Sequence, residues 1–224
     1  MAIKPILFNK QISTEMVRAI LDGRKTCKRR ILKHDVESIL NSPYHKKHPE
    51  VEDRQIISKL CQPPYQPGDI LYVRETFAWC PCWDCGFDTI PDGCRHPVIY
   101  DSKKREHGCY MYRASCEDNE YPSADTWHPS IHMPKEAARI WLKVTDVRVE
   151  RLQEISEDGA KAEGANFKNG KNVGFEEKMN RTAIERFTEI WNSTIKKSDL
   201  DRYGWDANPW VWVIEFERCE KPQK

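Results

Sequence analysis

Residues 13–30 read STEMVRAILDGRKTCKRR, which predicts an amphipathic helix followed directly by a dense basic turn. Either Ser13 or Thr14 can cap the helix, because a hydroxyl there accepts a hydrogen bond from a backbone N–H that has no helical partner. The apolar residues recur at helical spacing along one face, which consists of Met16, Val17, Ile20 and Leu21. Gly23 then predicts the end of the helix, since glycine readily takes the left-handed conformation found at helix C-termini.

Five apolar segments around this helix predict β-strands. They lie at residues 3–8, 70–74, 109–114, 138–149 and 210–216. The segment at 70–74 follows a Pro-Gly-Asp turn and is rich in β-forming side chains. The longest signal is at 138–149, where apolar side chains alternate with their neighbours as they do in a half-buried strand.

Short helices are expected between these strands. Residues 34–66 form a mostly polar surface excursion with one short helix at 36–40. A short helix with an acidic start is expected at 155–164, and a clearer amphipathic helix at 175–195. Strands at both ends of the chain, short helices and long loops together predict an α+β domain organised around a barrel. We expect one domain over residues 1–224.

The composition limits the function classes. The chain has 36 basic and 35 acidic residues, so a protein that coats nucleic acid non-specifically is not expected, and any such contact must come from a local patch. No apolar run of signal-peptide or membrane-spanning length is present. Nine cysteines without an export signal favour reduced thiols or a metal site. We therefore expect a soluble, cytoplasmic protein.

Five short strings, taken in order, resemble motifs of the ASCH family, in particular the ASCH proteins of phage and prophage genomes. The strings are GRKT at 23–26 followed by RR at 29–30, PGDILYVRET at 67–76, WHPSIHMP at 127–134, ARI at 138–140 and NPWVWVIEF at 208–216. The resemblance implies a PUA-like small β-barrel with flanking short helices and a cleft beside the first helix. ASCH members have been linked to RNA binding, to RNA cleavage and to hydrolysis of the acetyl-amide of N(4)-acetylcytidine.

The amidohydrolase members imply a catalytic Lys in the opening motif, a Thr three residues later and a Glu on a later helix. Carried over by position, the Lys is Lys25 and the Glu is Glu163, while Lys28 stands where the Thr is expected. A lysine near other cations loses its proton more easily and can then activate a hydroxyl nucleophile. A carboxylic acid can donate a proton to the leaving amine. Because Lys28 has no hydroxyl, Thr26 or an activated water would have to supply the nucleophile.

The same basic turn can act as a binding site instead. Six cations lie within ten positions and could contact phosphates: Arg24, Lys25, Lys28, Arg29, Arg30 and Lys33. A stacking face for an unpaired base could come from an aromatic residue, for which the candidates are Tyr72, Tyr110, Tyr112 and Trp127. The alternative is a solvated charged turn paired with the abundant carboxylates.

Three further residues are candidate ligand contacts on other segments. Arg74 and Glu75 end a predicted strand next to the expected cleft, and Arg113 follows Tyr112 on another strand. The alternative for Arg74 and Glu75 is a structural ion pair. The sequence alone leaves both possibilities open.

A cysteine-rich segment at about 77–107 lies outside the ASCH resemblance and is expected to be a loop insert. Cys82 and Cys85 have the spacing with which two thiolates bind one tetrahedral ion. The predicted metal ligands are Cys80, Cys82, Cys85 and Cys94, with His96 or Cys109 as alternatives. Such a set suits a structural zinc ion, which would order a segment with few apolar residues. The alternative is a set of free thiols in a flexible loop.

The function that we predict from the sequence is recognition of RNA or of a modified nucleoside in a PUA-like cleft, through the basic turn after the first helix. One alternative is a hydrolase, either an N(4)-acetylcytidine-type amidohydrolase or a ribonuclease, with Lys25 facing Glu163. A further alternative is a phage accessory protein that acts through protein partners. The oligomeric state is left open.

Overall fold

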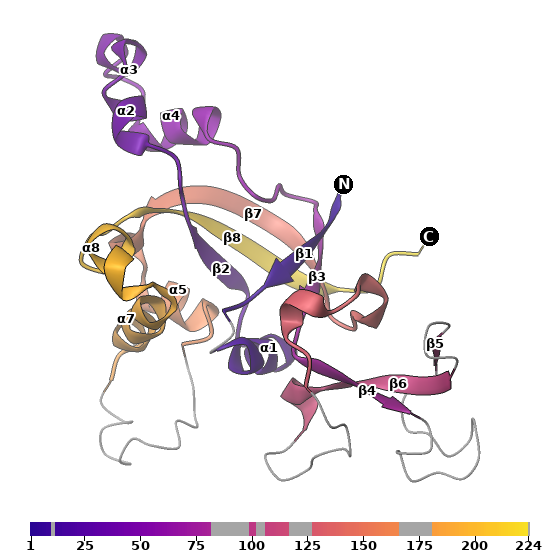
Figure 1. The fold of residues 1–224 in the computed structure, drawn as a ribbon. Coiled ribbons are helices and arrows are strands. Elements are labelled where there is room, and N and C mark those ends of the chain that lie inside the picture. Colours follow the sequence, from indigo (N-terminus) through magenta and orange to yellow (C-terminus); the bar gives the residue numbers. More distant parts are fainter. Residues whose placement is uncertain (10–11, 82–98, 102–105, 117–126, 166–180, 224) are drawn as a thin grey trace. The chain divides into compact units, whose positions relative to one another are not determined.

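The computed structural model describes residues 1–9, 12–81, 99–101, 106–116, 127–165 and 181–223 (Figure 1). The chain divides into two compact units. The first consists of Met1–Lys4, Ala19–Leu71 and Leu142–Glu220, and the second of Pro5–Arg18, Tyr72–Trp141 and Lys221–Lys224. A single domain over residues 1–224 stays a prediction.

The main sheet has five strands in the order β1-β3-β7-β8-β2. Their bounds are β1 Ile3–Leu7, β2 Cys27–Ile31, β3 Ile70–Arg74, β7 Trp141–Arg151 and β8 Trp210–Cys219. Figure 1 shows β7 and β8 as long, curved neighbours. This sheet and its short helices confirm the α+β class, whereas closure of the sheet into a barrel stays a prediction.

Strand β2 occupies residues for which the sequence analysis predicted a basic turn. It runs antiparallel to β8, with Arg29 opposite Val213 and Ile31 opposite Val211. Cys27 and Arg29 are buried, so the strand is covered on one face. The prediction of a turn was wrong because the high density of charge concealed this alternation. Pairing with an apolar strand outweighs the weak β propensity of lysine and arginine.

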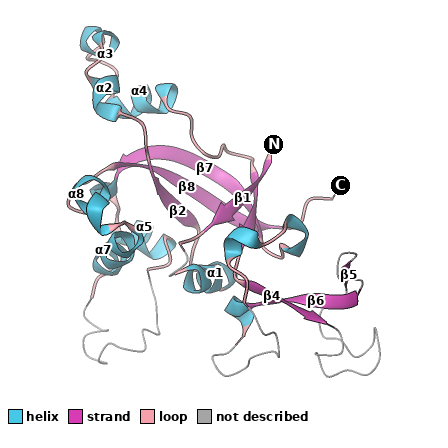
Figure 2. Ribbon diagram, in the orientation of Figure 1, coloured by secondary structure: helices cyan, strands magenta, loops and turns pink. Residues whose placement is uncertain are grey.

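The helices are short (Figure 2). Their bounds are α1 Ser13–Leu21, α2 Val36–Leu40, α3 Pro43–Lys47, α4 Asp53–Leu60, α5 Glu157–Ala162, α7 Ala183–Thr194 and α8 Leu200–Tyr203. Single 3-10 turns lie at Arg113–Ser115, Ser130–His132, Lys135–Ala137, Leu152–Glu154 and Lys197–Asp199. The excursion at 34–66 contains three helices where one was predicted. No helix in the described part of the chain is long and apolar enough to cross a membrane.

An apolar core joins α5 and α7 to β8 in the first unit. Its buried members include Ala160 from α5, Phe187 and Trp191 from α7, and Val211 and Val213 from β8. Figure 2 shows the two helices side by side next to the strand. Burial of these side chains stabilises the position of α5, with each large side chain contributing about 1.5–3 kcal/mol. The C-terminal end of α5 is therefore fixed relative to β2 and β8.

The second unit contains a separate three-stranded antiparallel sheet in the order β4-β6-β5. Its strands are β4 Phe77–Pro81, β5 Ile99–Asp101 and β6 Glu106–Tyr112. Strand β6 begins three residues before the strand predicted at 109–114 and ends two residues earlier. The segment predicted to be a cysteine-rich insert thus contributes strands at both of its ends, and its middle lies outside the described residues.

Candidate functional site

Strand β2 is the last strand of its sheet, so one of its edges faces away from the other strands. The N–H of Leu32 donates to the carbonyl of Trp210 at 3.0 Å. Near the start of the strand, the N–H of Phe216 donates to the carbonyl of Thr26 at 2.8 Å. Within β2, even-numbered positions therefore direct their N–H and C=O groups toward β8. The N–H of Arg29, at an odd-numbered position, points to the outer edge.

The carboxylate of Glu163 covers this outer edge. Glu163 is the C-terminal cap residue of α5, and one of its oxygens accepts a hydrogen bond from the backbone N–H of Arg29. The Nζ atom of Lys25 donates to Oε2 of Glu163 at 2.6 Å and to the carbonyl of the same residue at 2.7 Å. Lys25 and Glu163 also form an isolated antiparallel β-bridge. The structure thus brings together the two residues to which the sequence analysis assigned catalysis.

The Lys25–Glu163 pair is buried, with side chains only 1% and 9% exposed. Removing two charges from water costs several kcal/mol, and close attraction together with extra hydrogen bonds offsets this cost. Here both carboxylate oxygens and the ammonium group have such bonds. The close contact and these additional hydrogen bonds therefore stabilise the pair in its buried position.

Backbone contacts on both sides position the pair. The N–H groups of Arg24 and Lys25 donate to the carbonyl of Ala19 in α1, at 2.9 and 3.0 Å. Gly164 has a φ of +85°, and a Cβ atom built on it would lie 3.2 Å from the Cβ of Ala19 and 3.4 Å from that of Lys25. Glycine at this position therefore permits the close approach. Gly23 has a φ of +72°, which confirms the predicted helix end.

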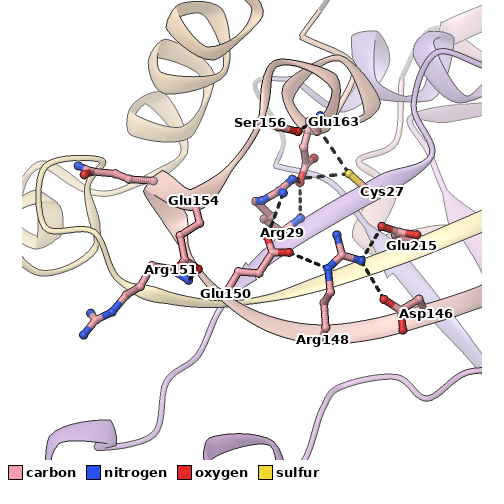
Figure 3. Close-up of polar contacts among 12 residues, drawn as sticks. Cys27, Arg29, Asp146, Arg148, Glu150, Arg151, Glu154, Ser156, Glu163 and Glu215 are labelled. Atoms are coloured by element: carbon pink, nitrogen blue, oxygen red, sulfur yellow. Dashed lines mark hydrogen bonds and ion pairs between the residues drawn. The ribbon is translucent and has the colours of Figure 1, made fainter. Parts of the chain in front are cut away.

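A chain of alternating charges runs from Glu163 across the sheet (Figure 3). The Nη1 atom of Arg29 lies 3.6 Å from Oε1 of Glu163, and its Nη2 atom lies 3.4 Å from Oε2 of Glu150 on β7. Arg148 donates to Oε1 of Glu150 at 2.6 Å. It also pairs with Asp146 at 2.8 Å and with Glu215 at 2.5 Å.

In this series of ion pairs, the side chain of Arg29 makes its contacts within the protein. Its side chain is 3% exposed, and the guanidinium carbon lies 5.9 Å from the centre of the Phe187 ring. Sequence reasoning had placed Arg29 among the ligand contacts and had not identified Glu150 or Arg148. The available signal was the alternation of Asp146, Arg148 and Glu150, which places three charged side chains on one face of a strand.

The side chains of Lys28 and Arg30 project from β2 on the face opposite that of Arg29, because successive side chains of a strand alternate between its two faces. Lys28 is half-buried and lies opposite Ile214, while Arg30 is exposed and lies opposite Trp212. Burial lowers the pKa of Lys28 to about 7, and the positive charges of Lys25 and Arg30 act in the same direction. The carboxylate of Glu163 opposes the shift. At neutral pH, Lys28 is thus a neutral amine in a large fraction of the protein molecules.

Three neighbours of the cluster have other roles. Burial raises the pKa of Cys27 to about 12, and Glu163 adds to this shift, so the group is a thiol at neutral pH and a poor nucleophile. Arg24 pairs with Asp22 at 2.7 Å, and both side chains are partly exposed. Thr26, just before β2, donates its backbone N–H to the carbonyl of Ala162 in α5 at 2.9 Å and so adds a further bond between this segment and α5.

The other predicted ligand residues lie in the second unit. Glu75 is buried and accepts two hydrogen bonds of 2.9 Å from Arg139, so its ion-pair partner is Arg139. Burial raises the pKa of Glu75, while Arg139 opposes the shift. Arg74 donates to the carbonyl of Ile131.

The remaining predicted contact in this unit combines a cation with an aromatic ring. The guanidinium carbon of Arg113 lies 5.7 Å from the centre of the Trp127 ring, a distance at which a cation–π contact is favourable. Both side chains are half-buried. Ligand binding by these residues, and by Arg74 and Glu75, stays a prediction.

The predicted zinc ligands are described only in part. Cys80 on β4 lies opposite Cys109 on β6, and both side chains are buried. Cys82, Cys85 and Cys94 lie outside the described residues, as does His96. Within the ranges that the structure describes, no group of three or more His, Cys, Asp or Glu side chains could hold a metal ion. Structural zinc stays a prediction.

Comparison with known proteins gives limited similarity. No protein-family model matches the chain. No curated protein matches it either. Among solved structures, the chain is similar to the crystal structure of an ASCH domain from Lactobacillus crispatus JV V101, with 11% sequence identity and a TM-score of 0.36 over 97% of this chain and 79% of that chain. The ASCH resemblance therefore rests on the five sequence strings.

Proposed function

We propose that this protein binds RNA or a modified nucleoside of RNA through the basic strand β2, in the manner of ASCH proteins. The observation that carries the proposal is the crowding of Lys25, Lys28 and Arg30 at and beside β2, where the carboxylate of Glu163 also lies. Mutual repulsion of these cations is relieved when an anion approaches. RNA phosphates are anions of this kind, and they are the usual ligands of lysine and arginine at nucleic-acid interfaces.

The residues of β2 divide into two roles under this proposal. Lys25 and Arg29 are buried and bonded to Glu163, so they maintain the local structure and its positive charge. Lys28 and Arg30 lie on the opposite face, and Arg30 is exposed. They are the residues that we expect to contact the ligand directly.

A local site agrees with the overall charge of the chain. The formal net charge is only +1, so long-range attraction of RNA is weak. We expect a short stretch of single-stranded RNA to bind, with about two phosphate contacts at β2. For single strands each neutralised phosphate changes the slope of log K against log salt by about 0.7.

The test is binding of a short single-stranded RNA at several salt concentrations. The double variant Lys28→Gln/Arg30→Gln is expected to bind RNA at least about tenfold more weakly than the wild type, with a shallower salt dependence. Lys196→Gln is the matched control, because Lys196 is an exposed lysine of the same unit. Equal affinity of all three proteins, or no binding at low salt, would refute the proposal. Absence of any nucleic-acid ligand would favour an accessory protein that acts through protein partners.

Amide hydrolysis is a second candidate, and it is favoured by one observation. The Nζ atom of Lys25 lies 2.6 Å from Oε2 of Glu163, within proton-transfer distance. In N(4)-acetylcytidine, water would add to the acetyl carbon, the C–N bond would break, and the pair would deliver a proton to the departing amine. The products would be cytidine and acetate. Since Lys28 has no hydroxyl and Cys27 is a buried thiol, water is the nucleophile that we expect.

Product formation tests this second candidate. Purified protein is incubated with N(4)-acetylcytidine, and cytidine is measured by chromatography. Loss of product in Glu163→Gln, with thermal melting still cooperative, would support hydrolysis. No product from the wild-type protein at any pH between 6 and 9 would exclude it and leave the binding proposal unaffected.

A further inference from the structure

We infer that the outer end of the helical excursion after β2 is a second contact surface for single-stranded RNA. Tyr44 on α3 stacks on an unpaired base, and Lys47 on the same helix contacts a phosphate of that strand. The inference rests on the proposed function for the class of ligand, RNA, but it names a surface apart from β2. None of the five ASCH strings includes these two residues.

The helices α2, α3 and α4 form a group of their own, which we call the arm. The main contacts of α2 with other helices and strands are those with α3 and α4. Residues 32–35 join β2 to α2, so the arm follows the proposed RNA-binding strand directly. Figure 1 shows α3 at the end of the arm that lies away from β7 and β8 of the same unit.

Side-chain contacts hold α3 in place, although a helix of five residues is not stable by itself. The side chain of Ser42 accepts a hydrogen bond from the backbone N–H of His45 at 3.3 Å and so caps the helix. Nε2 of His45 lies 2.9 Å from Oδ1 of Asp53 on α4. Arg54 of α4 in turn pairs with Glu154 at 2.7 Å. The end of the arm is therefore ordered before a ligand arrives, which lowers the entropy cost of binding.

Tyr44 is the most accessible aromatic residue of the described structure. It is 52% exposed, whereas the other Phe, Tyr and Trp side chains that the structure describes are buried or half-buried. The rings of Tyr44 and His48 lie 4.7 Å apart between their centres, with 41° between their planes. This contact orients the Tyr44 ring and leaves much of the side chain open to solvent. An unpaired base can stack on such a ring whatever its identity, because every base has a π-face.

The segment around Tyr44 is basic. Residues 38–49 contain no Asp or Glu. The two histidines at the end of α3 each lie 2.9 Å from a carboxylate oxygen. Lys46 and Lys47 are exposed, and neither forms an ion pair with any residue that the structure describes. An exposed ring beside such lysines matches a ligand that carries both bases and phosphates, which is single-stranded nucleic acid.

Lys47, rather than Lys46, is the cation beside Tyr44. Residues three apart on a helix are neighbours with Cβ atoms about 5–6 Å apart, and both Tyr44 and Lys47 belong to α3. Residues two apart do not face each other, so Lys46 projects from a different side of α3. A phosphate next to the base stacked on Tyr44 thus lies within reach of Lys47, and Lys46 provides a matched control.

The experiment measures binding of the full chain to two fluorescein-labelled single strands by fluorescence anisotropy. One strand is an oligoadenylate of ten residues, and the other has the same length and charge but lacks all bases. Titrations at 50 and 200 mM salt give the slope of log K against log salt. Because the abasic strand presents phosphates without bases, it separates the stacking contact from the ionic one.

Tyr44→Ala should bind the oligoadenylate at least about fivefold more weakly than the wild type, because a stacked base is lost. The same variant should bind the abasic strand within about twofold of the wild type. Lys47→Gln should bind both strands more weakly and reduce the salt slope by about 0.7, the value for one phosphate of a single strand. Lys46→Gln removes the same charge from a different side of α3 and should change the slope by less than half as much. All three positions are exposed, so unchanged thermal melting is expected.

The outcomes separate this inference from the proposed function. If Tyr44→Ala and Lys47→Gln bind as the wild type does while Lys28→Gln/Arg30→Gln binds more weakly, the inference is wrong and the proposed function stands. If only the two arm variants bind more weakly, the arm contact is supported and the role of β2 is wrong. Equal effects of Tyr44→Ala on the two strands, or of Lys46→Gln and Lys47→Gln on the slope, would overturn the contacts assigned to α3. If the wild type binds neither strand at low salt, both proposals are wrong.

Discussion

Nζ of Lys25 and Oε2 of Glu163 lie 2.6 Å apart, although the two residues are 138 positions apart in the sequence. The contact joins the segment after α1 to the end of α5. It is the point at which two distant parts of the first unit meet through buried charge. The backbone of β2 is fixed at the same place, since the N–H of Arg29 donates to the same carboxylate.

Removing one charge of this pair should destabilise the protein strongly. Glu163→Gln removes the buried carboxylate that accepts hydrogen bonds from Lys25 and from the backbone of Arg29, and such changes cost about 3–5 kcal/mol. The measurement is the free energy of unfolding from urea titration at pH 7. The control is Asp22→Asn, which removes an ion pair with Arg24 that is partly exposed and should cost less than about 1 kcal/mol. Similar losses in the two variants would contradict the structural role of the buried pair.

Gly164 should tolerate a side chain less well than Gly23. Both residues have positive φ, so alanine at either position is strained by about 1–2 kcal/mol. At Gly164 the added Cβ would also press against Ala19 and Lys25, whereas at Gly23 no atom lies within 4 Å. We therefore expect Gly164→Ala to lower the melting temperature several degrees more than Gly23→Ala does. Equal effects would show that the segment after α5 can shift to make room.

The sequence predicted those parts of the fold in which alternation of apolar residues is visible. Strand β7 is an example, because its buried Leu142 and Val144 alternate with exposed residues. Strand β2 was not predicted, because one of its buried positions is Arg29, whose partners Glu150 and Glu163 lie more than 100 residues away. No local pattern shows that an arginine in a basic run will be neutralised by distant carboxylates.

The candidate site was predicted in part for the same reason. The resemblance to ASCH proteins selected Lys25 and Glu163, and the structure places them in contact. The separation of Lys28 and Arg30 from Arg29 follows from the alternation of side chains along β2, and β2 forms as a strand through its tertiary pairing with β8. The sequence could identify the basic residues but could not divide them between the two faces of a strand.

Cys27 should be inert in the folded protein. With a pKa of about 12, only about one thiol in ten thousand is ionised at pH 8, and the side chain is buried. Iodoacetamide treatment followed by peptide mass spectrometry should modify the half-buried Cys219 well before Cys27. In urea, Cys27 should be modified fully. Rapid modification of Cys27 in the folded state would mean that the thiol is accessible, and it would reopen covalent catalysis by this residue.

Glu75 should give the second unit a measurable dependence of stability on pH. Burial raises its pKa in the folded state above the ordinary value of 4.5, so the folded protein binds this proton more tightly than the unfolded chain. Its contribution to stability is therefore largest below the ordinary value and is lost as the pH rises through the raised one. The variant Glu75→Gln cannot ionise, although it also loses the ion pair with Arg139. The difference in unfolding free energy, wild type minus Glu75→Gln, should decrease as the pH is raised from 4.5 to 7. A difference that increases over this interval would mean that the ion pair with Arg139 outweighs the cost of burying the charge.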